Sequence, residues 1–566
     1  MATDLIARGL AAKTWAAARA NTSIINVSSY YLPEHGANLR PAYQAAINAA
    51  AAINGRVVND YGAVTQQIWE KAFDTPNTFD VASINRNRTL TIPACSSIDI
   101  DFAGANIVLK GPTGGDRFAS GGQTVPGIAT AGFGFATWNG KWLPGFLIVL
   151  GVIKSLRIAN VDVDGGFTGD TVNQDNVILF DKGFLCQDLG DANLGVGVGT
   201  GRVAMDNVVM HGFAGEIMYD NSARELISRD CHFYNSGHSC WNPNGIGKVT
   251  AYNLQAGISR QPAEVLGGKG HTYFGGRFYK AGGAGSTFIG GPDPTFGAQY
   301  NDPVRRTDAP PPYVTFINTR FEDFPVGFLY LGSYMRGSII ATDVTLFLAT
   351  GFASGFTYKD VDLDVYATVD RVGGGSVVQV AGPATNDGTQ PRNVNVRVHA
   401  SRTALAVTNS TNRDKILALS GLIDPSCTFS VDGIGKKAFE AAPVAGTVLP
   451  FIDSTGFNQI SVGDFLYFAA NQTFTIASAK VQLFPTAAGT FDFILDTAPG
   501  YTDGQLFTFG HDGSGSADRI VSFAQNGSGM RLNATRTLRR AGEYLTLRRS
   551  DSGAVWVEHA YMGQGA

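Results

Sequence analysis

A repeat of 23 residues in the middle of the chain constrains the fold more than any other feature. Small polar or glycine residues stand 23 residues apart at four successive positions, Asn207, Asp230, Asn253 and Gly276. The series continues less regularly on both sides, at Asn160, Asn318 and Asp343. Nearly all of the residues four before and three after these positions are apolar. Each repeat is too short to bury its own apolar face, so successive repeats must stack on one another.

Short strands explain this repeat better than helices do. Segments rich in Val, Ile and Phe alternate with Gly, Asn and Asp over residues 90–440, and the leucine frame of a leucine-rich repeat is absent. We therefore predict an all-β fold, centred on a right-handed parallel β-helix with about 23 residues per rung. Rungs would lie about 4.8 Å apart, with Asn and Asp side chains hydrogen-bonded along one corner.

The two ends of the chain have patterns different from its centre. Residues 1–35 are predicted to form a short Ala-rich helix and a connector. Residues 36–440 are predicted to form the β-helix, which opens with a helix over 40–53 that stops at Gly55. Residues 441–566 contain longer strands and wide loops. They predict a sandwich-like antiparallel β domain that caps the β-helix.

Composition excludes several classes of protein. With 70 glycines and 16% charged residues the chain does not fit a coiled coil or helical bundle, and 44% hydrophobic residues do not fit disorder. The net charge of −4 and the lack of a basic tract offer no surface for nucleic acid or an anionic membrane. The longest apolar run, 142–153, is too short to cross a bilayer, and Arg8, Lys13 and Arg19 interrupt any signal peptide. We therefore expect a protein made in the cytosol without export.

Four parts of the chain carry a family resemblance: GLAAKTWAA, HGANLRPAYQAAINAA followed by RTLTIPACSSIDIDFAGANIVLKG, the repeats of 160–346, and LTLRRSDSGAVWVEHAY. Together they resemble bacteriophage tailspikes and tail-borne polysaccharide depolymerases with a pectate-lyase-like β-helix. The resemblance implies a homotrimer on the virion tail, joined to the tail or to another tail protein through its N-terminus. It also implies binding and cleavage of a bacterial surface polysaccharide (a capsule, an exopolysaccharide or a lipopolysaccharide O-antigen) during host adsorption.

Acidic residues on the third strand of the repeat are the candidates for catalysis. Counting from the corner places Glu216, Trp241 and Glu264 outward on three successive rungs. An exposed Trp241 would offer a flat face to a sugar ring, and the two carboxyl groups could bracket a glycosidic bond at the spacing of an inverting hydrolase if they converge. Asp220 in the next corner is the rival partner of Glu216, with Glu225 behind it. One carboxyl group would protonate the leaving oxygen and the other would activate water.

Further polar residues are candidates for substrate binding. His238 begins the strand that carries Trp241. His271 is expected on an outward row of charged side chains, which also holds Arg202, Glu225 and Lys248. We interpret this row first as a surface charge ladder, because such ladders are common on exposed strands.

Two insertions interrupt the 23-residue spacing. The second, residues 281–312, places Tyr300 and Arg305 on a long proline-rich loop, which either lines the glycan groove or packs against a neighbouring chain. The first, residues 165–201, is acidic and glycine-rich, but its carboxylates lack the spacing of a calcium loop. No cysteine pair has metal-site spacing either. We therefore predict neither a metal nor a cofactor.

Three functions remain open at this point. The leading prediction is an endo-acting glycoside hydrolase. A polysaccharide lyase on the same scaffold would use one of the histidines clustered over residues 211–271 as a base, with Arg260, Lys269 or Tyr273 beside it. A receptor-binding spike without enzymatic activity would only bind the glycan.

Overall fold

The structure, a computed structural model, describes residues 23–72, 89–118, 123–124, 141–142, 145–149, 152–168, 181–186, 201–220, 223–243, 247–265, 270–282, 285–288, 314–324, 329–344, 346–349, 359–369, 377–383, 390–402, 415–424, 426–433, 437–442, 451–455, 464–468, 472–474, 480–485, 489–495, 506–511, 519–525, 530–540, 543–550 and 556–563. The chain divides into two compact units. Unit one comprises Met1–Pro292 and Tyr300–Thr319, and unit two comprises Asp293–Gln299 and Arg320–Ala566.

Unit one opens with a strand, two 3-10 turns and a helix: β1 (Ile24–Asn26), η1 (Val27–Tyr30), η2 (Pro33–His35) and α2 (Arg40–Ile53). The helix predicted over 40–53 is confirmed with the same bounds. Asn54 ends it in the left-handed conformation with a φ of 54°, and the Gly55 N–H donates to Ala50 O at 2.8 Å. The helix predicted near the N-terminus falls on residues 1–22, outside the described part of the chain.

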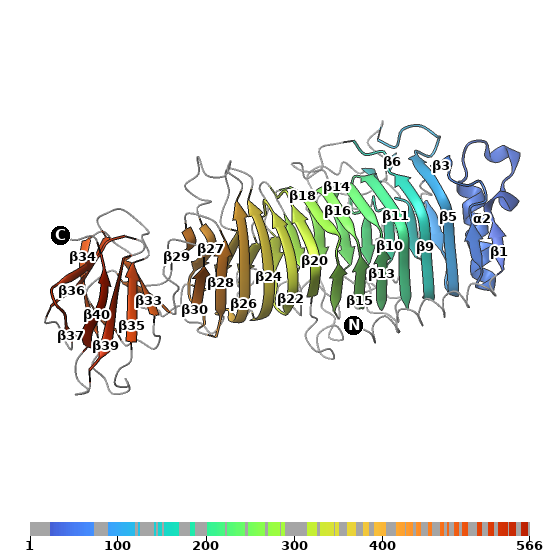
Figure 1. The fold of residues 1–566 in the computed structure, drawn as a ribbon. Helices are drawn as coiled ribbons and strands as arrows, with labels where there is room; N and C mark the ends of the chain where they lie inside the picture. The colour runs from blue at the N-terminus through green and yellow to red at the C-terminus, as the bar shows by residue number, and fades with distance from the viewer. Residues whose placement is uncertain are drawn as a thin grey trace. The chain divides into compact units, whose positions relative to one another are not determined.

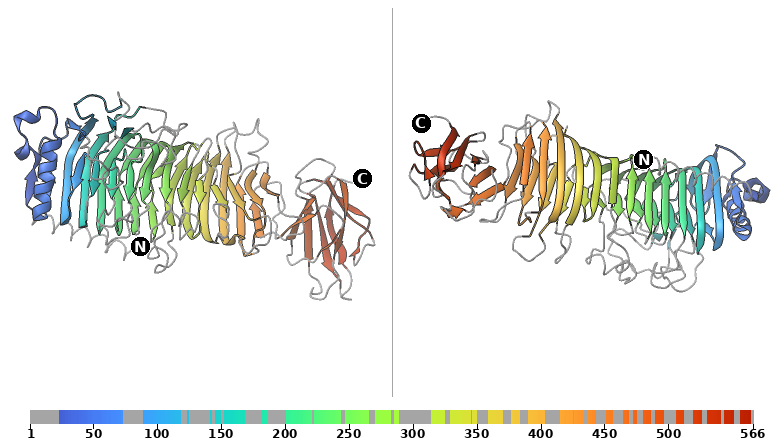
Figure 2. Two further views of the ribbon diagram at one scale, coloured as in Figure 1. Left: turned by 180° about the vertical axis from the view of Figure 1, so that it is seen from behind. Right: turned by 60° about the horizontal axis from the view of Figure 1, so that its bottom comes forward.

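The strands of unit one, coloured blue to green, lie side by side and pair mostly in parallel (Figures 1 and 2). They are β2 (Arg56–Val58), β3 (Thr65–Trp69), β4 (Leu90–Ile92), β5 (Cys95–Lys110), β6 (Gln123–Thr124), β7 (Lys141–Trp142), β8 (Leu147–Val149), β9 (Ile153–Asp164), β10 (Phe184–Cys186), β11 (Arg202–Phe213), β12 (Met218–Asp220), β13 (Glu225–Arg229), β14 (His232–Pro243), β15 (Lys248–Tyr252), β16 (Gln255–Val265), β17 (His271–Phe274), β18 (Arg277–Ala281), β19 (Ser286–Phe288) and β20 (Val314–Glu322). Strands distant in sequence thereby become neighbours.

The 23-residue spacing holds over a short stretch of this unit. Arg202 pairs with Glu225, and Glu225 pairs with Lys248, each 23 residues further along. The Asn253 amide donates to Asp230 Oδ1 at 2.9 Å, so the predicted bonding between corner side chains is present there. The left-handed conformation recurs at the predicted polar corners, with φ of 51–55° at Asn160, Asn207, Asp230, Asn253, Asn318 and Asp343.

The step does not stay constant, however. Val249 pairs with His271, 22 residues on, and Ser155 pairs with Arg202, 47 residues on. In addition, the long strand β11 pairs with both β13 and β14, and β16 pairs with both β18 and β19. By strand pairing the fold contains a closed, all-parallel barrel of eight strands with a radius of 9 Å, and 13 extra strands. The predicted right-handed parallel β-helix with about 23 residues per rung is therefore wrong. The constant length of 23 residues was inferred from the few repeats that carry no insertion.

Side chains that alternate with the outward ones form the core of unit one. Ile100, Ile158 and Met205 pair in register on β5, β9 and β11, and all three are fully buried. Such buried rows supply the hydrophobic stabilisation of the unit. Among the described residues, no helix has the length and apolar character needed to cross a membrane.

Unit two also begins with parallel ladders, β22–β24–β26–β28–β30 and β21–β23–β25–β27–β29. Their bounds are β21 (Leu329–Leu331), β22 (Met335–Thr342), β23 (Leu346–Ala349), β24 (Lys359–Val369), β25 (Val378–Ala381), β26 (Arg392–Arg402), β27 (Lys415–Ser420), β28 (Thr428–Gly433), β29 (Lys437–Ala442) and β30 (Phe451–Thr455). The parallel ladder thus continues beyond residue 440.

The C-terminal strands of unit two form two sheets, in the orders β31-β33-β35-β39-β40-β37 and β32-β34-β36-β38. Their bounds are β31 (Asp464–Phe468), β32 (Gln472–Phe474), β33 (Lys480–Pro485), β34 (Gly489–Leu495), β35 (Leu506–His511), β36 (Arg519–Phe523), β37 (Met530–Arg531), β38 (Arg536–Leu538), β39 (Tyr544–Arg549) and β40 (Trp556–Met562). β35–β39 and β39–β40 are antiparallel, whereas β31–β33 and β33–β35 are parallel. The predicted antiparallel C-terminal domain is wrong in this respect, because alternating side chains reveal strands but not their direction of pairing.

Candidate active site

Four neighbouring strands of unit one, β10, β12, β14 and β16, pair in register and bring polar side chains to one place. Lys182 and Glu216 lie two residues before the starts of β10 and β12. Asn242 lies in β14 and Glu264 in β16. The register therefore gathers residues that are up to 82 positions apart in the sequence.

The amide of Asn242 holds the two carboxylates together. Its Nδ2 donates to Glu216 Oε1 at 2.6 Å and to Glu264 Oε2 at 2.9 Å. The ammonium of Lys182 contacts the other oxygen of Glu216, Oε2, and lies 3.7 Å from the ring centroid of Tyr219. Glu216 is thus charge-paired on one oxygen and hydrogen-bonded on the other.

The imidazole of His238 lies between the same two carboxylates. Its Nδ1 is 3.7 Å from Glu216 Oε1 and 3.8 Å from Glu264 Oε2. The backbone N–H of His238 donates to Ser236 Oγ at 3.2 Å, within an irregular stretch where the register of β14 shifts. The side chains of His238 and Glu264 are 19% and 20% exposed, against 5% for Glu216, so the cluster is open to solvent on the side of the first two.

This cluster also has the donor atoms that a divalent cation requires. Single ligand atoms of Glu216, His238 and Glu264 lie within 4.8 Å of one another. However, Lys182 already balances the charge of Glu216, and an ion would have to compete with that ammonium. We assign no metal to these residues, and no cofactor.

Two other predicted acids do not join the cluster in the described part of the chain. Asp220 is 1% exposed at the end of β12, where its Oδ1 accepts a hydrogen bond from the Ala223 N–H at 2.9 Å and so stabilises a turn. Glu225 is exposed on β13, with its Oε2 3.2 Å from Arg202 Nε. The structure therefore brings Glu216, Glu264 and His238 together and leaves Glu225 on a different ladder.

The expected outward position of Trp241 is wrong. Its side chain is fully buried, stacks on Phe233 with ring centroids 5.8 Å apart, and donates from Nε1 to Tyr273 Oη at 3.1 Å. The register of β14 shifts between Ser236 and Ser239, and such a shift changes which side chains face inward. Trp241 therefore belongs to the core and is not a platform for a sugar.

His271 is also buried, with 1% of its surface exposed. It pairs with Val249 and not with Lys248, because this step of the ladder is 22 residues long. The one-residue difference moves it from the outward row to the inward one. Tyr300 and Arg305 lie outside the described residues.

Two residues of the cluster, Lys182 and Asn242, were missed in the sequence. Lys182 lies inside the insertion 165–201, where counting from a corner has no reference point. Asn242 directly follows Trp241 in WNPN, and its place next to a predicted strand residue was the only available signal.

Comparisons with known proteins give a likeness among solved structures. No protein-family model matches the chain, and no curated protein matches it. Among solved structures, the chain is similar to the A-module of a mannuronan C-5 epimerase from Azotobacter vinelandii, with a TM-score of 0.42 and 13% sequence identity. The match covers 76% of this chain and 98% of that one.

Proposed function

We propose that the chain is a polysaccharide depolymerase that hydrolyses glycosidic bonds in a bacterial surface polysaccharide, with Glu216 and Glu264 as its catalytic pair. One observation carries the proposal: the two carboxylates have oxygens within 4.8 Å of each other, bridged by the Asn242 amide. Retaining glycosidases hold their two carboxyl groups about 5–5.5 Å apart, and inverting ones about 6.5–9.5 Å apart. The spacing favours retention, in contrast to the inverting spacing considered from the sequence.

The two carboxyl groups have surroundings that suit different roles. In a retaining reaction an ionised carboxylate attacks the anomeric carbon while the second carboxyl group protonates the leaving oxygen. Lys182 balances the charge of Glu216, which suits the attacking carboxylate. Glu264 is the more exposed of the two and suits the acid, because it can exchange its proton with water.

The second step regenerates both groups. Glu264 takes a proton from a water molecule, and the oxygen of that water attacks the anomeric carbon and displaces Glu216. Asn242 and Lys182 act as positioning residues here, since both contact Glu216 and neither needs to gain or lose a proton. His238 lies close enough to both carboxylates to respond to their charge.

The test is cleavage of purified bacterial surface polysaccharides by the full chain. We would incubate it with capsule, exopolysaccharide and O-antigen from a panel of strains and measure new reducing ends together with ultraviolet absorbance of unsaturated uronates. We expect reducing ends without a rise in absorbance, and loss of cleavage in Glu264→Gln. A rise in absorbance would assign a lyase, and binding without any product would assign a receptor-binding spike. Either result would overturn the proposal.

A matched control separates catalysis from general charge effects. Glu225→Gln makes the same chemical change on a different ladder, at a side chain paired with Arg202. We expect this variant to cleave as the parent chain does. Equal losses in Glu225→Gln and Glu264→Gln would contradict the assignment of the site.

We propose further that the chain acts as a homotrimer on a phage virion tail, which its resemblance to tailspikes supports. Sedimentation equilibrium of the full chain should give three times the mass of one chain. A monomer at micromolar concentration would contradict this setting and leave the assignment of the catalytic pair intact.

A further inference from the structure

The first half of β14 carries a second group of polar side chains on another ladder. His211, His232, Tyr234 and Tyr279, here called the ring row, come from β11, β14 and β18. Tyr234 pairs with His211 on one side and with Gly257 on the other, and Gly257 pairs with Tyr279. The catalytic pair lies beyond Asn235, whose φ of 58° turns β14 away from this ladder.

The rings stack on one another along the ladder. Ring centroids are 4.7 Å apart for His211 and Tyr234 and 4.5 Å apart for His232 and Tyr234. The first distance matches the spacing of about 4.7–4.9 Å between neighbouring strands, whereas the second joins two residues of the same strand, β14. The stacked faces cover each other, so the half-buried rings of His211, His232 and Tyr234 offer their polar edges.

Tyr279 reaches across the ladder to complete the row. Its Oη lies 2.7 Å from His232 Nε2. A Cβ at position 257 would lie 2.4 Å from Tyr279 O and 2.5 Å from its Cδ1, so only glycine leaves room for this ring. The glycine is required by close approach of both the backbone carbonyl and the ring of Tyr279, and not by its own backbone conformation.

The histidine and tyrosines of this contact are neutral at pH 7. Burial, together with the nearby Arg277 guanidinium and His211, lowers the pKa of His232 to about 4. Burial also raises the pKa of Tyr279 to about 12 and raises that of Tyr234 above its ordinary value. The contact between the Tyr279 hydroxyl and His232 Nε2 is therefore a hydrogen bond between two uncharged groups.

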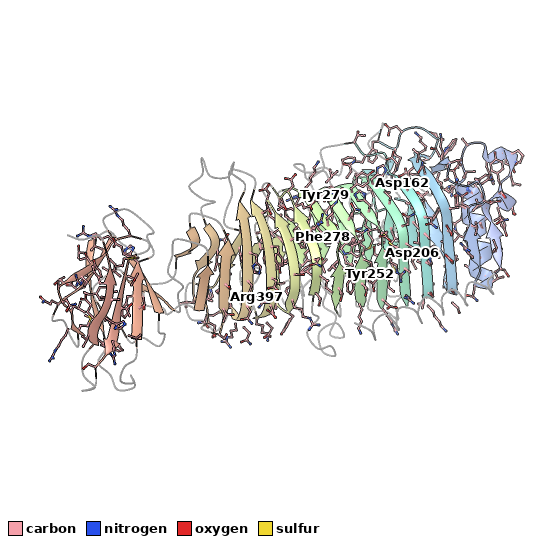
Figure 3. All side chains as sticks on the ribbon, in the orientation of Figure 1. Asp162, Asp206, Tyr252, Phe278, Tyr279 and Arg397 are labelled. Atoms are coloured by element: carbon pink, nitrogen blue, oxygen red, sulfur yellow. The ribbon has the colours of Figure 1, made fainter. Side chains whose placement is uncertain are left out.

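Charged groups lie at both ends of the ring row. Asp162 Oδ1 is 3.4 Å from His211 Nε2, and Asp164 Oδ1 is 3.7 Å from His211 Nδ1. Both aspartates are 44% exposed, and the Gly166 N–H fixes Asp164 with a hydrogen bond of 2.8 Å. At the other end the Arg277 guanidinium lies 4.4 Å from the ring centroid of Tyr279. Asp162 and Tyr279 lie toward the same end of their strands (Figure 3).

We propose that the ring row and its two aspartates bind an uncharged glycan chain that lies across the strands. His211 and Tyr234 place hydrogen-bonding edges on the neighbouring strands β11 and β14, and the distance between them is close to the length of one sugar residue in an extended chain. Carboxylates accept hydrogen bonds from neighbouring sugar hydroxyls, and such charge-assisted bonds are the stronger ones. Two aspartates against one arginine leave a net negative charge, which disfavours a polyuronate. This inference goes beyond the proposed function, since it concerns binding on a different ladder from Glu216 and Glu264.

The experiment measures binding to the full chain carrying Glu264→Gln, so that cleavage does not remove the ligand. The probes are neutral hexasaccharides of 1,4-linked glucose, mannose and galactose, with hexagalacturonate as the acidic comparison, and saturation-transfer nuclear magnetic resonance reports contact. We expect at least one neutral hexasaccharide to bind and hexagalacturonate to bind at least about tenfold more weakly. Failure of all three neutral probes, or preference for hexagalacturonate, would overturn the proposal.

Further substitutions in the Glu264→Gln chain test whether the glycan binds at the ring row. Asp164→Asn keeps the shape of the side chain and should weaken binding about tenfold, and Tyr234→Phe, which removes one hydroxyl, should weaken it less. Tyr366→Ala is the matched control in unit two, where an exposed tyrosine stacks on His399 with centroids 4.8 Å apart. An equal loss in the control, or no loss in Asp164→Asn, would contradict the assignment. Binding is measured separately from cleavage. If the parent chain cleaved no polysaccharide but the Glu264→Gln chain still bound a neutral hexasaccharide, only the proposed function would be refuted.

Discussion

Two pairs of carboxylates in unit one, one buried and one partly exposed, are held in different ways. Glu70 and Asp181 share the guanidinium of Arg117, at 2.6 Å and 2.5 Å, and all three side chains are at most 1% exposed. Glu216 and Glu264 share the amide of Asn242 and are 5% and 20% exposed. Both arrangements satisfy hydrogen bonds. In the first a single cation contacts both acids, whereas in the second the shared contact is a neutral amide and the ammonium of Lys182 contacts Glu216.

The difference indicates which pair can do chemistry. Arg117 also donates to Gly165 O at 2.6 Å, and Asp181 accepts a hydrogen bond from the Ala214 N–H at 2.7 Å, so this group links five segments of the chain and is closed to solvent. In the second pair a neutral amide brings the two carboxylates close, Lys182 balances one of the two negative charges, and the open side near Glu264 admits a substrate. The first pair is therefore interpreted as structural and the second as functional.

The largest expected effect is on stability, from Arg117→Met. Removing the guanidinium leaves Glu70 and Asp181 buried without their cation, which costs about 3–5 kcal/mol. Urea unfolding followed by circular dichroism would measure this loss. Arg397→Met is the control, because Arg397 is 44% exposed and its pairs with Asp362 and Asp364 should contribute less than about 1 kcal/mol. Similar losses in the two variants would remove the distinction drawn here.

The next effect is on cleavage, from Glu264→Gln. Loss of a general acid lowers the rate by a factor of about 10²–10⁴. The free energy of unfolding should change by less than about 1 kcal/mol, because the glutamine amide can still accept from Asn242 through its oxygen. Reducing-end assays and urea midpoints on the same preparation measure both quantities. A variant that lost stability and activity together would indicate that this pair is structural as well.

A smaller effect is expected from Asn242→Asp, which replaces the shared donor by a third carboxylate. Leaving Glu216 and Glu264 without this donor should destabilise the chain by about 1–3 kcal/mol. Asn242 is a positioning residue, so its loss should let the two carboxylates move apart while other contacts to the sugar remain. We therefore expect kcat to fall by a larger factor than KM rises. An increase in KM alone would show that Asn242 binds substrate and does not position the acids.

The convergence of Glu216 and Glu264 could be predicted from the sequence because the 23-residue steps around β12, β14 and β16 carry almost no insertion. Trp241 could not be placed, because a register shift within β14 leaves no trace in the pattern of apolar residues. The overall fold could not be predicted either. Some paired residues are 47 or 58 positions apart in the sequence, and the insertions between them hide the pairing. Local spacing is encoded by side chains near the corner, whereas closure of the strands depends on contacts between segments distant in sequence.

The smallest effect concerns Asp206, which is about as exposed as Glu264 but is held by two arginines. Its carboxylate accepts hydrogen bonds from Arg157 Nε at 2.6 Å and Arg229 Nη1 at 2.7 Å, and its side chain is 21% exposed. Burial acts to raise the pKa of Asp206, but the hydrogen bonds from Arg229 and Arg157 outweigh it, so the pKa lies below its ordinary value of 3.8. A lowered pKa in the folded state means that the ionised form stabilises the fold above pH 3.8 and that this contribution is lost as the pH falls through the lowered pKa. We expect Asp206→Asn to be less stable than the parent by about 1 kcal/mol at pH 7, and the two urea midpoints to converge as the pH is lowered below 3.8. If the difference between the two urea midpoints stayed constant over this pH range, Asp206 would stabilise the fold by packing and not by its charge.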